Sequence, residues 1–176
     1  MSISTKIKKD IRSWSRDVLE EPSKFLNGFP PCPYAKSAWK QKKVSIEVFN
    51  LPEGCEGGLI GCPEIFDDGI KSILEDDKDV HIIAIPNWQE LGSAENTDVA
   101  CMEANKVLDP SDIYLMSFHP EDQPDSENFE FLYETYDEQP GLDYYAMIFV
   151  QRLSLLNAAS DALMSKGYYD NWKVKA

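Results

Sequence analysis

The chain has 176 residues, the size of one domain, and its 43% hydrophobic and 11% aromatic content suffices for an ordinary packed core. Its 31 acidic and 17 basic residues give a net charge of −14, which argues against nucleic-acid binding because that affinity comes chiefly from Lys and Arg. No apolar run approaches the roughly 18 residues of a membrane helix and the first residues lack a secretory signal, so we expect a soluble, cytoplasmic protein that binds no membrane.

The first 43 residues predict a basic helix followed by an irregular loop. Apolar residues at 7, 11, 14 and 18 share one helix face, so 1–27 is predicted to be a basic N-terminal helix that Pro22 interrupts or ends. Three prolines in four positions then predict a proline-rich loop within 28–43, which carries Cys32.

Residues 44–118 alternate between strand-like and helix-like patterns and predict a βαβαβ core. Strands are expected at 44–49, 80–85 and 113–118. Helices are expected over about 63–75, with apolar positions 65, 66, 70, 73 and 74 facing inward, and over 96–108, which carries Val99, Met102 and Val107.

The rest of the chain predicts an acidic loop and a final strand and helix. Residues 119–143 form the acidic loop, and 144–167 begin as a strand and continue as a helix. The predicted fold class is α/β in a single domain spanning 1–176. We expect a single-layer mixed or partly parallel sheet covered by helices, as in a ferredoxin-like or similar sandwich.

The charge is unevenly distributed. The first 43 residues hold ten of the 17 bases and four acids, a net charge of +6 against −20 for the remainder. No base occurs between Lys106 and Arg152. Three interpretations stay open for this acidic stretch: it is solvated, it lies under the basic N-terminal helix, or it binds a basic partner.

Cys32 is one candidate for a reactive residue. The four cysteines include no CxxC pair, so they do not form a zinc signature, and we expect reduced thiols. The prolines hold Cys32 in a rigid loop just before Lys36 and Lys40, and nearby cations favour the thiolate. The alternative is that a small side chain fills the loop against the core.

His119 is the second candidate, because it follows a predicted strand at the edge of the sheet where ligands bind. Its imidazole can act as a general base or a metal ligand, or it can anchor its loop through a hydrogen bond. His81, at the start of a strand, is expected to be packed or hydrogen-bonded. Cys32, His119 and Asp122 are the candidate metal ligands, and the identity of any metal or cofactor stays open.

Several short motifs resemble DUF1415, a family of small bacterial proteins of unknown function, in matching order along the chain: Trp14, CPYAK at 32–36, FHP at 118–120 and MIFVQRLSLLNAAS at 147–160. The family has Phe where Tyr34 stands, and a late His and Glu where Phe149 and Leu153 stand, so the chain resembles a divergent member. The resemblance implies a shared site at Cys32 and His119, and it implies no substrate.

Two functions from different classes follow. In the first, the protein is a small-molecule enzyme with catalytic Cys32 and His119, an anion anchor at Arg152, and substrate contacts at Lys36 and Tyr34. That hypothesis requires the sulfur and the imidazole to lie within about 4 Å, and it fails if they lie on opposite sides of the sheet. In the second, the protein is a non-catalytic accessory or interaction protein. Its partner would be basic and would bind the acidic face at 121–143.

Overall fold

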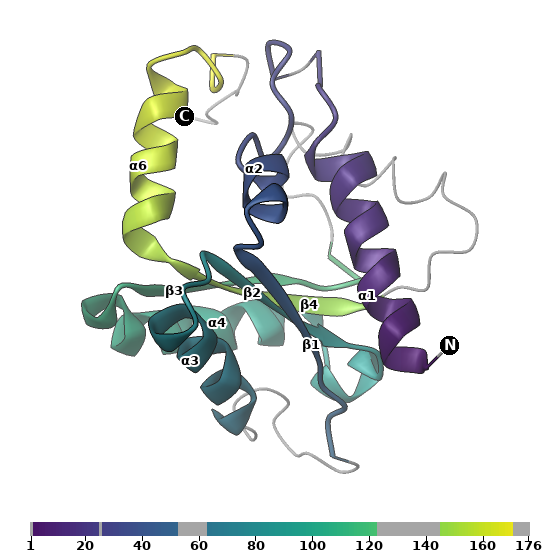
Figure 1. Ribbon diagram of the computed structural model, residues 1–176. Helices are drawn as coiled ribbons and strands as arrows, with labels where there is room; N and C mark the ends of the chain where they lie inside the picture. The colour runs from purple at the N-terminus through teal and green to yellow at the C-terminus, as the bar shows by residue number, and fades with distance from the viewer. Residues whose placement is uncertain (1, 25, 53–62, 123–144, 171–176) are drawn as a thin grey trace.

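The computed structural model describes residues 2–24, 26–52, 63–122 and 145–170 (Figure 1). The helical elements are α1 (Ile3–Trp14), η1 (Ser15–Leu19), α2 (Ala35–Lys40), η3 (Pro63–Phe66), α3 (Asp67–Glu75), η4 (Trp88–Leu91), α4 (Ala94–Leu108), η5 (Asp109–Ser111) and α6 (Leu153–Met164). The strands are β1 (Val44–Val48), β2 (Val80–Ile85), β3 (Ile113–Phe118) and β4 (Ala146–Arg152). The part of the predicted acidic loop from 123 to 143 lies outside the described residues, as do two of the cysteines.

The described strands form one mixed sheet in the order β1-β2-β4-β3. β1 and β2 are parallel, and β4 lies antiparallel to both β2 and β3. The three strands predicted in the core are confirmed to within one residue, as is the change from strand to helix in the last segment. The predicted mixed sheet covered by helices is therefore confirmed.

Helices cover both faces of the sheet. In Figure 1, α1, α2 and α6 lie above the sheet and α3 and α4 lie below it. The upper core contains the predicted apolar face of the N-terminal helix: Ile7, Ile11, Trp14 and Val18 pack on Ile82, Ala84, Met147 and Phe149. The lower core is larger and includes Ile73, Ile83, Ile85, Ala100, Cys101, Leu115, Ile148 and Val150. No described helix has the length and apolar character needed to cross a membrane.

One expectation about a helix face needs correction, and the structure shows which face of α4 is buried. Leu74 was expected to point inward but is 51% exposed, because Ile73 takes the inward position and the next residue is rotated by about 100°. In α4 the apolar residues Val99, Met102 and Val107 are exposed. Smaller side chains at 97, 100, 101 and 104 follow the true helical spacing and face the sheet.

Gly69 allows α3 to lie directly on the sheet. A Cβ atom at this position would lie 2.8 Å from Cγ2 of Val150 and 3.2 Å from Cδ2 of His81. Both neighbours are buried and have little room to move. The glycine therefore sets the distance between α3 and the polar residues of β1 and β2 beneath it.

Two asparagine carboxamides take the place of a neighbouring strand. Asn87 accepts from the Leu51 N–H (3.1 Å) and donates to the Leu51 carbonyl (2.9 Å), which extends the pairing beyond the ends of β1 and β2. Asn105 of α4 does the same for Leu115, at 2.7 and 2.9 Å, in the middle of β3. The outer edge of β3 is thus closed at its centre by a side chain.

Candidate functional site

His119 follows the last residue of β3, at the edge of the sheet where the sequence placed it. The side chain is buried, and its ring packs edge-on against Trp88 with 5.3 Å between centroids. Its Nδ1 accepts from the Glu121 N–H (3.2 Å), while its own backbone N–H donates to Asp122 (2.8 Å). The buried Nε2 has no hydrogen-bond partner among the described residues. These bonds support the loop-anchoring interpretation of His119.

Cys32 lies in the loop between η1 and α2. Its N–H donates to the Leu19 carbonyl (2.9 Å), which ties the loop to the end of η1. Burial raises the pKa of the Cys32 thiol, and the carboxylate of Glu20 raises it further, against a smaller lowering by the backbone N–H groups of Ala35 and Tyr34. The expectation that nearby cations would favour the thiolate is therefore wrong in direction.

The three residues of the hypothetical enzyme site lie in three different places. Cys32 contacts Leu19 on the α1 side of the sheet, whereas the His119 ring packs on Trp88, which belongs to the core on the α3–α4 side. Arg152 pairs with the first residue of β3, at the end of the strand opposite to His119, and donates to the Ile73 carbonyl at 2.6 Å. The described residues thus do not assemble a site from Cys32, His119 and Arg152.

The candidate metal ligands and Tyr34 have structural partners instead. Asp122 bonds the backbone of His119, and the described residues contain no group of three His, Cys, Asp or Glu side chains arranged to hold a metal ion. The Tyr34 hydroxyl points to the Ala159 carbonyl of α6, at 3.5 Å. Tyr34 therefore lies between α2 and α6.

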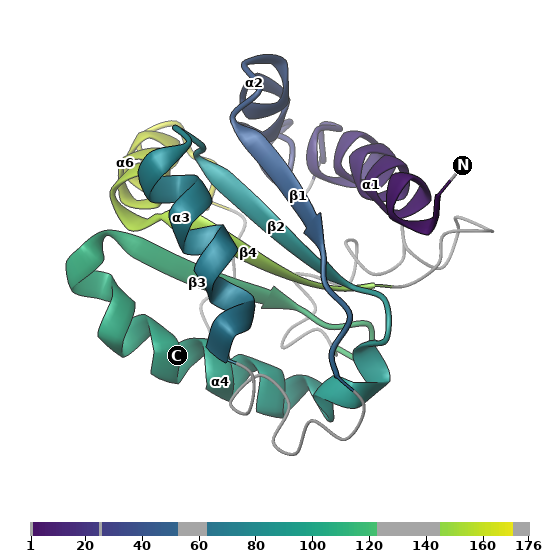
Figure 2. The same cartoon turned by 60° about the horizontal axis from the view of Figure 1, so that its bottom comes forward.

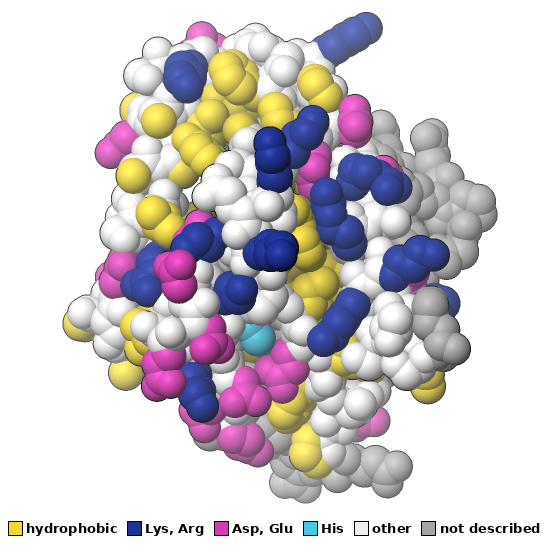
Figure 3. Space-filling model, in the orientation of Figure 1, with side chains coloured by type: hydrophobic (Ala, Val, Ile, Leu, Met, Phe, Trp, Pro, Cys, Tyr) yellow, Lys and Arg dark blue, Asp and Glu magenta, His cyan; other side chains and the backbone are white. Residues whose placement is uncertain are grey.

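Of the predicted site residues, Lys36 lies in a concave surface. A groove of about 510 Å³ runs between the α1–η1 helix and α2, and we call it the basic groove. Figure 3 shows Lys and Arg side chains gathered over these helices, with hydrophobic side chains between them. Its lining residues are Arg12, Arg16, Glu20, Glu21, Lys36, Trp39 and Lys40.

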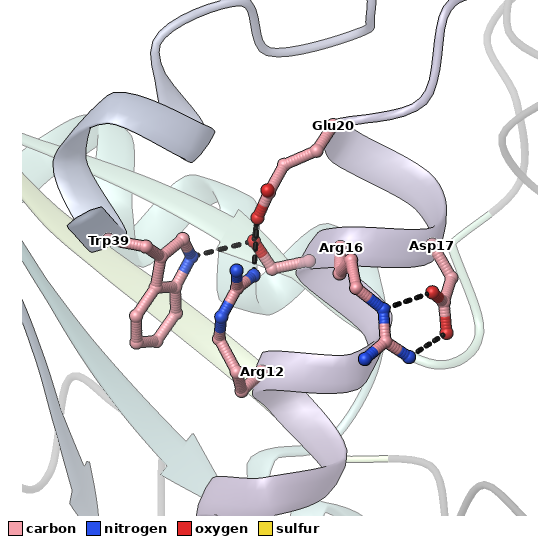
Figure 4. Close-up of polar contacts among 6 residues, drawn as sticks. Arg12, Arg16, Asp17, Glu20 and Trp39 are labelled. Atoms are coloured by element: carbon pink, nitrogen blue, oxygen red, sulfur yellow. Dashed lines mark hydrogen bonds and ion pairs between the residues drawn. The ribbon is translucent and has the colours of Figure 1, made fainter.

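Bonds among the groove residues hold its wall in place (Figure 4). The Arg12 guanidinium lies 4.8 Å from the Trp39 ring centroid and also bonds the Glu20 carboxylate. The Trp39 indole N–H donates to Ser15 Oγ at 2.7 Å, and this hydroxyl donates to Glu20 at 3.3 Å. These contacts connect α1, η1 and α2 and fix the Trp39 ring as an apolar part of the wall.

The basic side chains of the groove differ in how far they are neutralised. Arg16 makes two hydrogen bonds to Asp17, at 2.7 and 3.0 Å, and the bonding from Arg16 lowers the pKa of Asp17. Arg12 is bonded to Glu20. Lys36 and Lys40 are exposed, lie one helical turn apart on α2, and have no carboxylate partner among the described residues.

Sequence reasoning missed this groove, although one signal for it was present. The excess of bases in the first 43 residues indicated where positive charge collects. The single π-helical turn at Ser15–Leu19 was invisible in the sequence, and such turns often occur at functional sites. The basic segment forms a concave surface only because α2 packs beside this π-helical turn.

A second polar cluster joins β1, β2 and α3. His81 is buried, and its Nδ1 lies 2.9 Å from Ser45 Oγ, which in turn lies 2.9 Å from Ser72 Oγ. Its Nε2 lies 3.4 Å from the Glu47 carboxylate. Burial lowers the pKa of His81 and raises the pKa of Glu47. The prediction that His81 is packed or hydrogen-bonded is confirmed, and the structure shows both.

No protein-family model matches the chain, and neither the curated proteins nor the solved structures compared with it give a match. The resemblance to DUF1415 stays a prediction. The candidate site therefore depends on the geometry of the groove itself.

Proposed function

We propose that the protein is a non-catalytic binding protein whose basic groove takes an anionic group of its ligand. The observation that carries this proposal is the gathering of four cationic side chains, against two carboxylates, around one groove in a chain of net charge −14. Like charges held close together repel, and an anion between them turns that repulsion into attraction. A concave basic surface on an acidic molecule also directs an anionic ligand to one place.

Lys36 and Lys40 would make the first contacts with the anion. They are exposed and unpaired with any carboxylate among the described residues, so an anion competes with no internal partner there. Arg12 would contribute through guanidinium N–H groups that its bond to Glu20 leaves over, while Trp39 keeps the guanidinium in place. A ligand with more than one negative charge fits this arrangement best, because the bases are spread along the groove.

The test is calorimetric titration with inorganic pyrophosphate, a small anion of high charge. We expect the wild type to bind it and the double variant Lys36→Gln/Lys40→Gln to bind about tenfold more weakly or less, since it loses two charged contacts. The matched control is Lys71→Gln/Lys166→Gln, which lowers the net charge equally at exposed sites outside the groove lining. Equal weakening in both double variants, or none in either, would overturn the proposal.

A further inference from the structure

β1 is an edge strand with an open side. It pairs with β2 alone. The bonds at its two ends, from the Val80 N–H to the Lys43 carbonyl and from the Phe49 N–H to the Ala84 carbonyl, show that the odd-numbered residues bond to β2. The peptide groups of Val44, Ile46 and Val48 therefore point away from the sheet, because successive residues of a strand alternate. All five β1 residues are partly exposed, and no described strand pairs with this side.

The two edge strands of the sheet differ in whether side chains bond their outward peptide groups. On β3 the Asn105 carboxamide occupies both peptide groups of Leu115, and the neighbouring Ser117 hydroxyl donates to Asp98 of the same helix. Figure 2 shows β1 at the opposite margin of the sheet. Among the described residues no backbone or side-chain group is shown bonding the outward peptide groups of β1. An open strand edge readily pairs with another extended chain.

Positive charge flanks this open edge. Lys8 lies on α1, whose neighbouring residue Ile7 shares a core cluster with the β1 residues Val44, Ile46 and Val48. Arg12 follows one turn later on the same helix, and Lys40 ends α2 four residues before β1 begins. The side chains of Val44, Ile46 and Val48 share a core cluster with Trp39, so the basic groove and β1 lie on one face of the sheet.

We propose that the partner is an extended acidic peptide segment, which pairs with the open edge of β1 and places its carboxylates on the side of α1 and α2. The inference rests on the proposed function and names the ligand class of the same groove. Backbone hydrogen bonds to residues 44, 46 and 48 supply the pairing, and alternate side chains supply the specificity. On the other face Glu47 and Asp68 lie near the edge, so the segment carries neutral side chains there.

The probe is a fluorescent peptide, Thr-Glu-Val-Glu-Thr-Glu-Val, with its carboxylates on one face when extended. We expect it to bind the wild type and to slow hydrogen exchange of the Ile46 amide, which points outward. The Ser45 and Glu47 amides already bond β2 and act as internal references. A matched peptide with Gln for every Glu should bind about tenfold more weakly or less, because it keeps the backbone and loses the charge.

Backbone methylation of the peptide tests the pairing without altering the protein. Methyl groups on alternate nitrogens remove the donors of one edge only, so one of the two alternating patterns should weaken binding about tenfold and the other should not. The protein variant Ile46→Pro tests the same pairing from the other side. It removes one outward donor of β1 and leaves the bonds to β2 intact, so it should weaken peptide binding. Its thermal unfolding is compared with that of the wild type to check that the variant is folded.

The outcomes separate the two proposals. Peptide binding that is sensitive to Lys36→Gln/Lys40→Gln but indifferent to both methylation patterns, with no change at the Ile46 amide, would overturn strand pairing and leave the anion-binding groove standing. Failure of both pyrophosphate and the acidic peptide to bind would overturn the proposed function itself. Equal binding of the acidic and the Gln peptide through the Ile46 edge would overturn the acidic specificity.

Discussion

At the scale of single residues, the protonation state of the buried His81 gives the first prediction. Burial lowers its pKa from the ordinary 6.5, with Asp68 acting against that change and Lys8 adding to it. Glu47 faces the Nε2 atom, and Ser45 faces Nδ1. The folded protein therefore holds His81 in its neutral form at a pH where the unfolded chain would begin to protonate it.

We expect the stability contribution of His81 to be lost on acidification. Because the folded pKa lies below the unfolded value of 6.5, the unfolded state binds more protons as the pH falls through that window, and the free energy of unfolding decreases. The measurement is urea unfolding of wild type and His81→Gln across this range. The difference in stability between the two proteins should shrink towards low pH, by at most about 1.4 kcal/mol per pH unit.

The variant also provides the control. Gln keeps a hydrogen-bonding group near Ser45 but does not titrate. Subtracting the free energies of unfolding of the two proteins therefore removes the contributions of the carboxylates that both proteins share. A difference that stays constant, or grows as the pH falls, would show that the histidine is not held neutral in the folded state.

At the scale of secondary-structure elements, the contrast between the edges of β3 and β1 gives a second consequence. Asn105 fills both peptide groups of Leu115, whose N–H and carbonyl would otherwise lack a protein partner on that side. A helix residue thus protects an edge strand that its own sheet leaves unpaired. The protection depends on a side chain that carries a donor and an acceptor together.

We expect Asn105→Ala to lower the free energy of unfolding by about 1–3 kcal/mol, because two backbone groups lose their partners. The freed edge should also increase self-association at high protein concentration. Chemical denaturation and light scattering measure the two effects. Asn157→Ala, at an exposed site on α6, is the matched control and should change neither. Unchanged stability in Asn105→Ala would mean that the carboxamide does not protect the edge.

The elements themselves could be predicted from the sequence because their signals are local. Alternation in VSIEV and the apolar run VHIIAI located β1 and β2, and the helical spacing of Ile7, Ile11 and Trp14 located α1. The inward face of α4 was harder to predict, since its small buried residues give a weaker signal than exposed Val99 and Met102. Burial there follows from the closeness of helix and sheet, which no local pattern encodes.

The candidate site was less predictable than the fold. Cys32 and His119 attracted attention through their sequence neighbours, but the sheet separates them. The basic groove arises where α1, a π-helical turn and α2 meet, and its geometry depends on the Ser15–Trp39 contact across 24 positions. Lys36 was predicted to contact substrate and does line the groove, whereas Arg152 bonds the backbone of α3.

At the scale of the whole molecule, two opposing fields act on an anionic ligand. The chain as a whole carries −14 and repels it at a distance, while the groove attracts it at short range. Salt screens distant charges before close ones, because the Debye length shortens from about 30 Å at 0.01 M to about 10 Å at 0.1 M. The two fields can therefore be separated by ionic strength.

We expect pyrophosphate affinity to fall as salt rises from about 0.1 M to about 0.5 M, where the remaining interaction is the local one in the groove. In Lys36→Gln/Lys40→Gln this dependence should nearly vanish. Titrations at several salt concentrations measure the slope. The control Lys71→Gln/Lys166→Gln should keep the wild-type slope, and an equal slope in all three proteins would assign the attraction to charges outside the groove.

The difference between the two edges of the sheet also limits how many strands can be added to it. With Asn105 blocking one margin, a strand added to β1 occupies the remaining open margin of the described sheet. Pairing of one β1 with a second copy would likewise use up the open margin of both chains and produce a closed pair with twofold symmetry. A bound peptide still carries an outer edge of its own, whereas the twofold pair ends on both sides in β3 strands whose centres Asn105 closes. In the pair, growth of the sheet by edge addition therefore ends after a single event.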